Sequence, residues 1–151
     1  MEIRVDDPRR EPNARLLTEH LADMAAVTPP ESVHTLPIEG LCAPDVTFWT
    51  VWEDGELLGC GALRELDPLH GEIKSMRTAP AHLRKGIGAA LLRHIIAEAH
   101  RRRYTRLSLE TGSFEAFAPA RALYTRFGFT PCEPFADYVL DPNSAYLTLA
   151  L

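Results

Sequence analysis

A loop leading into a helix that starts at two glycines is the feature that most constrains this chain. The segment runs from Thr78 to Arg93, and its glycines are Gly86 and Gly88. Glycine lets the backbone approach a ligand without a Cβ in the way. The first N–H groups of a helix have no intrahelical partners, and the helix dipole adds partial positive charge there. Because Arg84 and Lys85 stand directly before the first glycine, the segment predicts a phosphate or pyrophosphate site at a strand–loop–helix junction.

Three phosphate-binding designs compete for this segment. A P-loop needs four residues between its glycines and then Gly-Lys-Ser/Thr, and the chain has no such run. A dinucleotide fingerprint needs Gly-x-Gly-x-x-Gly directly after a strand. Here Leu91 stands at the third glycine position, and the link from Ala79 to Lys85 separates strand from glycines. A nicotinamide-dinucleotide binder therefore stays open only as a minor alternative.

The third design is that of the GNAT family of N-acetyltransferases, whose signature is Gln/Arg-x-x-Gly-x-Gly/Ala. The run Leu83-Arg-Lys-Gly-Ile-Gly88 resembles it at both glycines and departs from it at Leu83, where the family carries Gln or Arg. A second run, Ala120-Arg-Ala-Leu-Tyr-Thr-Arg-Phe-Gly-Phe129, resembles the family's C-terminal signature. It reads as a helix that ends at a glycine before a strand. The departure there is Phe117, where many members carry Asn.

The resemblance implies acetyl-CoA as the acyl donor and a cofactor-binding segment that covers the end of one strand and the glycine loop. The residues that it assigns to acetyl-CoA are Met76, Arg77, Thr78, Leu83, Arg84, Lys85, Gly86, Ile87, Gly88 and Ala89. Backbone N–H groups around Met76 to Thr78 are expected to polarise the thioester carbonyl. No metal-ligand spacing is present, so no metal site is expected.

Three side chains are candidates for proton transfer. Glu72 is the first choice for the base, because it lies at the spacing from Gly86 that the family's histone-acetylating branch uses for its catalytic Glu. An ion pair with Lys74 is the structural alternative for Glu72. Glu110, at the end of the next strand, is the rival base. Tyr124 is the candidate acid, because a phenol is protonated at neutral pH and donates a hydrogen bond.

Hydrophobic periodicity and turn residues predict an α/β (α+β) fold, and the resemblance implies a mixed, mostly antiparallel central sheet flanked by helices. The expected strands are Glu2–Val5, Val46–Trp52, Glu56–Leu66, Gly71–Thr78, Arg106–Thr111, Phe129–Glu133 and Ser144–Leu151. The expected helices are Asn13–Ala26, a short one near Ile38, Gly86–Arg103 and Glu115–Phe127. With no linker or repeat, residues 1–151 are expected to form one domain.

Composition narrows the class of protein. A formal charge of −5 argues against nucleic-acid binding and mildly favours a cationic amine acceptor. No stretch is apolar enough for a membrane span, and the first residues lack a signal-peptide core. Three cysteines, Cys42, Cys60 and Cys132, are interpreted as reduced core thiols of a cytoplasmic protein. The Arg101–Arg103 run is interpreted as a solvated helix end.

The function expected from these features is acetyl-CoA-dependent N-acetyl transfer. The acceptor is a primary amine, on a small molecule or a protein, that attacks the thioester directly. The alternative is a non-catalytic CoA-binding or sensing domain of the same fold. A homodimer is expected through the edge and apolar face of the last two strands.

Overall fold

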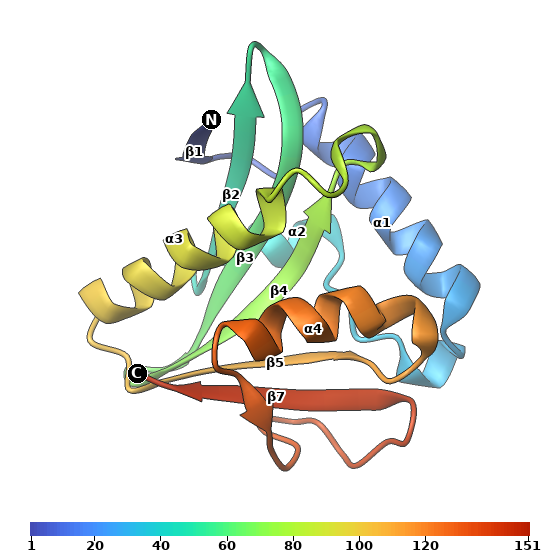
Figure 1. Cartoon of the computed structure of the whole chain (residues 1–151), viewed down its shortest axis with the longest axis vertical. Coiled ribbons are helices and arrows are strands. Elements are labelled where there is room, and N and C mark those ends of the chain that lie inside the picture. The colour runs from blue at the N-terminus through green and yellow to red at the C-terminus, as the bar shows by residue number, and fades with distance from the viewer.

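The computed structural model describes all 151 residues, which form a seven-stranded sheet in the order β1-β2-β3-β4-β5-β7-β6 (Figure 1). The strands are β1 (Glu2–Val5), β2 (Val46–Glu53), β3 (Glu56–Asp67), β4 (His70–Thr78), β5 (Arg106–Gly112), β6 (Thr130–Pro131) and β7 (Ser144–Ala150). All neighbours pair antiparallel except β4 and β5, which run parallel. The expected mixed, mostly antiparallel sheet is confirmed.

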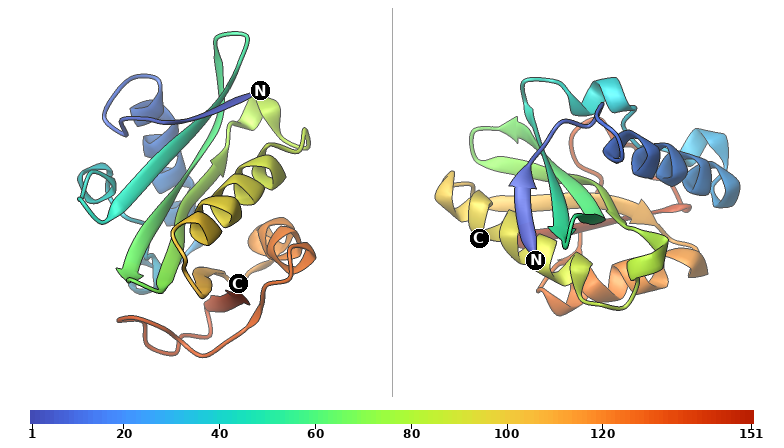
Figure 2. Two further views of the ribbon diagram at one scale, coloured as in Figure 1. Left: turned by 90° about the vertical axis from the view of Figure 1, so that its left-hand side faces the viewer. Right: turned by 90° about the horizontal axis from the view of Figure 1, so that it is seen from above.

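Helices cover both faces of the sheet. The α-helices are α1 (Asn13–Val27), α2 (Ile38–Leu41), α3 (Ile87–Arg101) and α4 (Ala118–Arg126), and the 3₁₀ turns are Pro30–Ser32, Pro80–His82 and Glu115–Phe117. Figure 2 shows α3 and α4 on one face and α1 on the other. Each face has its own buried cluster. The larger one lies under α3 and α4 and contains Leu91, Ile95 and Tyr124, and the smaller one lies under α1 and α2 and contains Leu16 and Leu41.

The two parallel strands, β4 and β5, stay together over only a short ladder. His70, Gly71 and Glu72 pair with Arg106, Leu107 and Ser108, and no pairing between the two strands follows. Figure 1 shows the strands diverging from this end, so that the sheet opens as a wedge. Both strands continue beyond the ladder, β4 to Thr78 and β5 to Gly112. Their facing edges in the wedge therefore carry N–H and C=O groups with no strand partner between them.

Local sequence accounts for most element boundaries. Asp54 and Gly55 both have positive φ (51° and 76°) in the turn that joins β2 to β3, as an Asp-Gly hairpin requires. The helix expected from Asn13 is confirmed, as is the short helix at Ile38. The buried stripe of α3 contains Ile87, Leu91, Leu92, Ile95 and Ala99, as its periodicity predicts.

Three expectations need correction. The strand expected over Phe129–Glu133 is only Thr130–Pro131, because proline cannot donate to a ladder and β7 offers its other edge to β5. The helix expected from Glu115 begins with a 3₁₀ turn and is α-helical only from Ala118. Of the cysteines, Cys60 alone is a core thiol, whereas Cys42 is exposed and Cys132 is half-buried.

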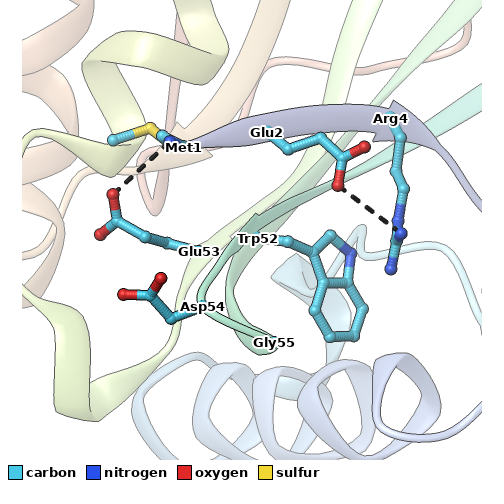
Figure 3. Close-up of a pocket in the computed structure, with 7 residues that line it drawn as sticks. All are labelled: Met1, Glu2, Arg4, Trp52, Glu53, Asp54 and Gly55. Atoms are coloured by element: carbon cyan, nitrogen blue, oxygen red, sulfur yellow. Dashed lines mark ion pairs between the residues drawn. The ribbon is translucent and has the colours of Figure 1, made fainter.

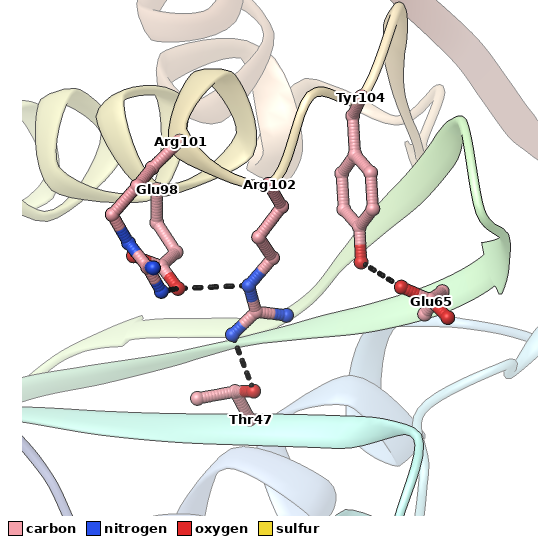
Figure 4. A network of polar contacts seen from close by, with 6 residues as sticks. All are labelled: Thr47, Glu65, Glu98, Arg101, Arg102 and Tyr104. Atoms are coloured by element: carbon pink, nitrogen blue, oxygen red, sulfur yellow. Dashed lines mark hydrogen bonds and ion pairs between the residues drawn. The ribbon is translucent and has the colours of Figure 1, made fainter.

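The arginine run after α3 does more than face solvent. Arg101 and Arg102 both pair with Glu98 one turn back, and Arg102 Nη2 also donates to Thr47 Oγ1 on β2 at 2.8 Å (Figure 4). Tyr104, just beyond, donates to Glu65 on β3 at 2.7 Å. The end of α3 is thereby tied to the sheet, and Arg102 is an anchor where a solvated side chain was expected.

Candidate active site

The glycine loop lies where β4 ends and α3 begins. Gly86 caps α3 in the left-handed region (φ 79°), and Arg84 also has positive φ (63°). A Cβ added at Gly86 would meet no atom within 4 Å, so the backbone here faces open space. A Cβ at Gly88 would lie 3.2 Å from Leu123 Cδ2 on α4 and 4.0 Å from Thr78 Oγ1. Open space beside the free N–H groups of a helix start fits the pyrophosphate of a coenzyme.

The last part of β4 is the segment whose backbone N–H groups the family resemblance places beside a thioester. Its register against β3 breaks between the Cys60–Arg77 and Ala62–Lys74 pairs, and Ser75 in this bulge has φ 55°. A non-glycine residue in the left-handed region is strained, and such strain is common at functional sites. Met76, Arg77 and Thr78 follow the bulge on the edge that β5 has left. The free backbone N–H and C=O groups of this edge can therefore form hydrogen bonds with a ligand that lies along the wedge.

Glu72 is buried in a polar cluster on the α1 side of the sheet. Ile73 belongs to the core under α3, so its neighbours Glu72 and Lys74 face the other way. Lys74 Nζ lies 3.4 Å from Glu72 Oε2, and the two side chains are 8% and 2% exposed. The Tyr138 hydroxyl donates to the same carboxylate oxygen at 2.6 Å and accepts from Lys74 at 2.9 Å. The ion pair considered for Glu72 from sequence is therefore present.

Glu110 faces the same side of the sheet from across the wedge. Leu109 lies in the core under α3 and α4, so its neighbour Glu110 points to the other face. Glu110 lies two residues beyond Ser108, the last residue of β5 that pairs with β4. Burial raises the pKa of Glu110, and the Glu72 charge acts in the same direction. The charges of His34 and Lys74 act against it. A carboxyl group with a raised pKa beside an open strand edge is suited to accept a proton.

Tyr124 lies on the opposite face, in α4. Figure 1 shows α4 over the wedge in front of β5. The side chain is 6% exposed and packs edge-on against Phe129 at 5.7 Å between ring centroids. Burial raises the pKa of its hydroxyl, so the phenol stays protonated at neutral pH. Its hydroxyl makes no hydrogen bond within the protein, which leaves the proton free for a bound group.

Sequence reasoning missed Tyr138, which lies between β6 and β7. Its ring packs against His34, Phe135 and Tyr146 at 5.1, 5.1 and 5.8 Å between centroids. The loop that carries it is held to the segment before α2, because Ser32 Oγ donates to Asp141 Oδ2 at 2.6 Å. The segment that carries Ser32 and His34 and the loop that carries Tyr138 together cover the α1 side of the wedge, and we call this cover the roof. A pair of aromatic residues in an otherwise Pro- and Asp-rich connection was the available signal.

Two further residues, His82 in the loop before Arg84 and Phe117 after β5, are engaged by neighbouring groups. His82 contacts Glu56 and Lys85 at 2.6 and 3.1 Å, so its ring is engaged away from the helix start. Phe117 packs against Gly112, where a Cβ would overlap its ring. A shallow hollow between β1 and the β2–β3 turn is lined by Glu2, Arg4, Trp52 and Glu53, and it lies at the far edge of the sheet (Figure 3).

Arg77 and His20 lie where α1 packs on β4, on the same face as Glu72. Arg77 Nη2 donates to Asp23 Oδ2 of α1 at 2.7 Å. His20, one helical turn before Asp23, is 7% exposed and its Nδ1 has no partner. Burial, together with the smaller effect of the Arg77 charge, lowers the pKa of His20 to about 4, and the Asp23 charge acts in the opposite direction.

We expect His20 to contribute to acid denaturation. The unfolded state, with a pKa near 6.5, binds the proton more tightly than the folded state, where the pKa is about 4. This contribution to stability is therefore present above pH 6.5 and is lost as pH falls toward 4, by about 2–3 kcal/mol between pH 7.5 and 4.5. Urea titrations of His20→Gln should show a shallower pH dependence by that amount. The exposed His100→Gln is the matched control, and an equal change in both variants would contradict the assignment.

Comparison with known proteins agrees with this geometry. A sequence profile described as the acetyltransferase (GNAT) family matches residues 14–129. The chain belongs to the GNAT family. It is 56% identical over 151 residues to the uncharacterised N-acetyltransferase YsnE of Bacillus subtilis (strain 168), with both chains covered completely. A solved structure described as an acyl-CoA N-acyltransferase from Klebsiella pneumoniae aligns with a TM-score of 0.81 and 28% identity, covering 99% of this chain and 97% of that one.

The fold is shared more widely within the GNAT family. A GNAT acetyltransferase from Elizabethkingia anophelis, solved with acetyl-CoA bound, aligns with a TM-score of 0.69 at 20% identity, over 99% of this chain and 97% of that one. The GNAT protein described here is thus an acetyl-CoA-dependent N-acetyltransferase, and acetyl-CoA is its acyl donor. No helix in the structure has the length and apolar character needed to cross a bilayer.

Proposed function

We propose that this GNAT protein acetylates a primary amine within the β4–β5 wedge, with Glu110 as the base and Tyr124 as the acid. The observation that carries the proposal is their placement on opposite faces of one opening in the sheet. Glu110 has a raised pKa on the face roofed by Tyr138, and Tyr124 has an unpaired hydroxyl on the face covered by α4. Donor and acceptor then meet in the opening, each approaching from its own side.

The glycine loop and the free edge of β4 are proposed to hold the donor. N–H groups from Arg84 to Ala89 receive the pyrophosphate, with the side chains of Arg84 and Lys85 as counter-charges. The backbone at Met76, Arg77 and Thr78 aligns the arm and polarises the thioester carbonyl. Bound acetyl-CoA supplies the acetyl group that is transferred. Leu83 and Ile87 flank the loop, and Ile87, which is 3% exposed, anchors the helix start in the core.

The proton balance of the transfer follows from the two titratable groups. Glu110 takes a proton from the acceptor ammonium, and the neutral nitrogen attacks the carbonyl carbon. A C–N bond forms, the C–S bond breaks, and Tyr124 gives its proton to the departing sulfur. The nitrogen then loses its second proton to solvent, and solvent returns one proton to the Tyr124 oxygen, so that the net proton released is the one taken up by Glu110. Glu72 is less suited to the base role, because its carboxylate oxygen already accepts from Lys74 and Tyr138. Glu72 is proposed instead to hold the side chains of Lys74 and Tyr138 in place.

The alternative, a CoA sensor without catalysis, is favoured by no particular contact. Release of CoA thiol with a panel of primary amines, measured with a thiol reagent, separates the two functions. We expect thiol release that depends on both acetyl-CoA and amine. Acetyl-CoA binding by calorimetry with no thiol release for any amine would favour the sensor.

Substitution at Gly86 should abolish acetyl-CoA binding. Val at this position places branched atoms in the open space beside the helix start and strains a backbone at φ 79°. Gly55→Val is a matched control, because Gly55 has φ 76° and equally open surroundings at a remote turn. Both variants should lose about 1–2 kcal/mol of stability, but only Gly86→Val should lose affinity in calorimetric titration. Gly88→Val should also lose affinity, and a folded Gly88→Val with unchanged affinity would contradict the placement.

A further inference from the structure

Four of the five buried polar side-chain atoms without a hydrogen-bond partner belong to α1 and β4, and three of these four lie near the end of β4. These three are His20 Nδ1 on α1, and Ser75 Oγ and Arg77 Nε on β4. Buried polar atoms are normally satisfied, so unpaired ones point to a group that the protein is built to receive. All three flank the stretch of β4 that borders the wedge. This stretch lies outside the apparatus proposed for proton transfer.

The Arg77 guanidinium has one free donor on the edge that can bind a carboxylate with two hydrogen bonds. Its Nη2 donates to Asp23 Oδ2 at 2.7 Å, whereas its Nε–H is buried and unpaired. The Nε–H and Nη2–H groups lie on one edge of the guanidinium and together match the two oxygens of a carboxylate. Asp23, whose side chain is 59% exposed while that of Arg77 is 15% exposed, fills only one of these two positions. A second carboxylate arriving from the wedge would occupy both positions and displace Asp23.

His20 adds a neutral polar ring beside Arg77. It sits one helical turn before Asp23, which ion-pairs with Arg77, so the three side chains share one face of α1 and the strand below. A neutral imidazole carries one N–H donor, and the side chain is more than nine-tenths buried. A buried ring nitrogen without a partner is unfavourable unless a bound group pairs with it. Arg77 thus places a positive charge beside this neutral ring, on a protein whose net charge is negative.

We propose that the acceptor of this enzyme carries a carboxylate as well as an amine, and that Arg77 binds this carboxylate with His20 beside it. The inference rests on the proposed function, because it assigns the acceptor to the same wedge. Arg77 lies on the Glu72 face, beyond the bulge at Ser75, and Glu110 faces that side from β5. An aminocarboxylic acid then spans the opening, with its amine toward Glu110 and its carboxylate on Arg77. This refines the cationic acceptor that net charge alone favoured.

Matched acceptor pairs test the assignment. Phenylalanine with phenethylamine, leucine with isopentylamine, and lysine with cadaverine differ by one carboxylate. We expect a higher kcat/KM for each amino acid than for its decarboxylated partner. Charge-assisted bidentate contacts are worth about 10- to 100-fold. Arg77→Gln should remove that preference, so that the ratio of kcat/KM between each amino acid and its decarboxylated partner falls toward one. Arg77→Lys keeps the charge but loses the paired donors, and should recover less than half of the preference on a logarithmic scale.

Asp23→Asn is the opposing variant. If Asp23 competes with the acceptor carboxylate for Arg77, its removal should lower KM for the amino acids by several-fold and leave the decarboxylated amines unchanged. Arg77 in a purely structural role predicts equal losses for both members of each pair in Arg77→Gln and no gain in Asp23→Asn. That result would overturn the inference, and thermal unfolding of each variant establishes that it is folded.

Direct binding separates this inference from the proposed function. Calorimetric titration of the three amino acids into the protein, without acetyl-CoA, should give binding that Arg77→Gln removes. Binding without any acetyl transfer would contradict the proposed function and leave the carboxylate site standing. Transfer to decarboxylated amines with no preference for amino acids would contradict the carboxylate site alone. Absence of binding for all three amino acids would also overturn it.

Discussion

Replacing Glu110 by Gln is expected to lower kcat/KM by about 10²- to 10⁴-fold, the usual contribution of a general base. The carboxylate must be ionised to accept a proton, so wild-type activity should fall as pH drops through its pKa. Because burial raises that pKa from its ordinary value of 4.5, the acidic limb should lie above pH 4.5. Glu110→Gln should abolish this limb, as measured by pH profiles of thiol release with a single amine.

Glu72→Gln is the control on the opposite strand. It keeps the length of the side chain and its hydrogen bond with Tyr138, while the buried Lys74 loses its charge partner. We expect lower stability, by several kcal/mol, because a buried lysine is left without its carboxylate. The acidic limb should persist. A limb that vanishes in Glu72→Gln and remains in Glu110→Gln would transfer the base to Glu72, and a limb that persists in both would leave proton removal to water.

Tyr124→Phe is expected to lower kcat by about 10²- to 10⁴-fold while acetyl-CoA affinity changes little. The hydroxyl makes no hydrogen bond within the protein, and the ring packs against Phe129, so removing the oxygen leaves the packing intact. The interaction that is lost exists mainly as charge develops on the leaving sulfur. Steady-state kinetics and calorimetry on the same preparation measure the two effects separately.

A second tyrosine provides the matched control for Tyr124. The Tyr104 hydroxyl donates to Glu65 at the far end of α3, so Tyr104→Phe removes one hydroxyl from the core without touching the wedge. It should reduce stability by about 1 kcal/mol and leave kcat unchanged. Equal losses of kcat in the two variants would mean that the Tyr124 effect is structural.

Periodicity and turn chemistry predicted most of the fold, because each signal acts within a few neighbouring residues. The Asp54–Gly55 turn, the stripe of α3 and the glycine stop after α4 are local in this sense. The edge strand β6 was overestimated for the same reason. A run containing Phe129 and Cys132 looks β-prone, but its length depends on β7, which pairs with β5 on its other side.

Part of the candidate site could be predicted from the sequence, and part of it could not. The glycine loop and Tyr124 are carried by two contiguous runs, which the family resemblance made readable. The choice between Glu72 and Glu110 depends on Tyr138, which reaches Glu72 from a residue far along the chain. The role of Arg77 depends on Asp23 in α1. Such long-range pairs leave no periodic trace, so the electrostatics of the wedge could not be predicted from any single segment.

The short ladder between β4 and β5 also bears on how the molecule unfolds. Three residue pairs join a half that contains β1 to β4 to a half that contains β5, β7 and β6, although cores and helices add further contacts. Amide hydrogen exchange is expected to divide along this seam, with partial openings that release the β5–β7 half before global unfolding. A coenzyme seated along the free edge of β4 would act as a missing strand. Saturating acetyl-CoA should then slow exchange on both sides of the seam together, turning two loosely joined units into one cooperative body.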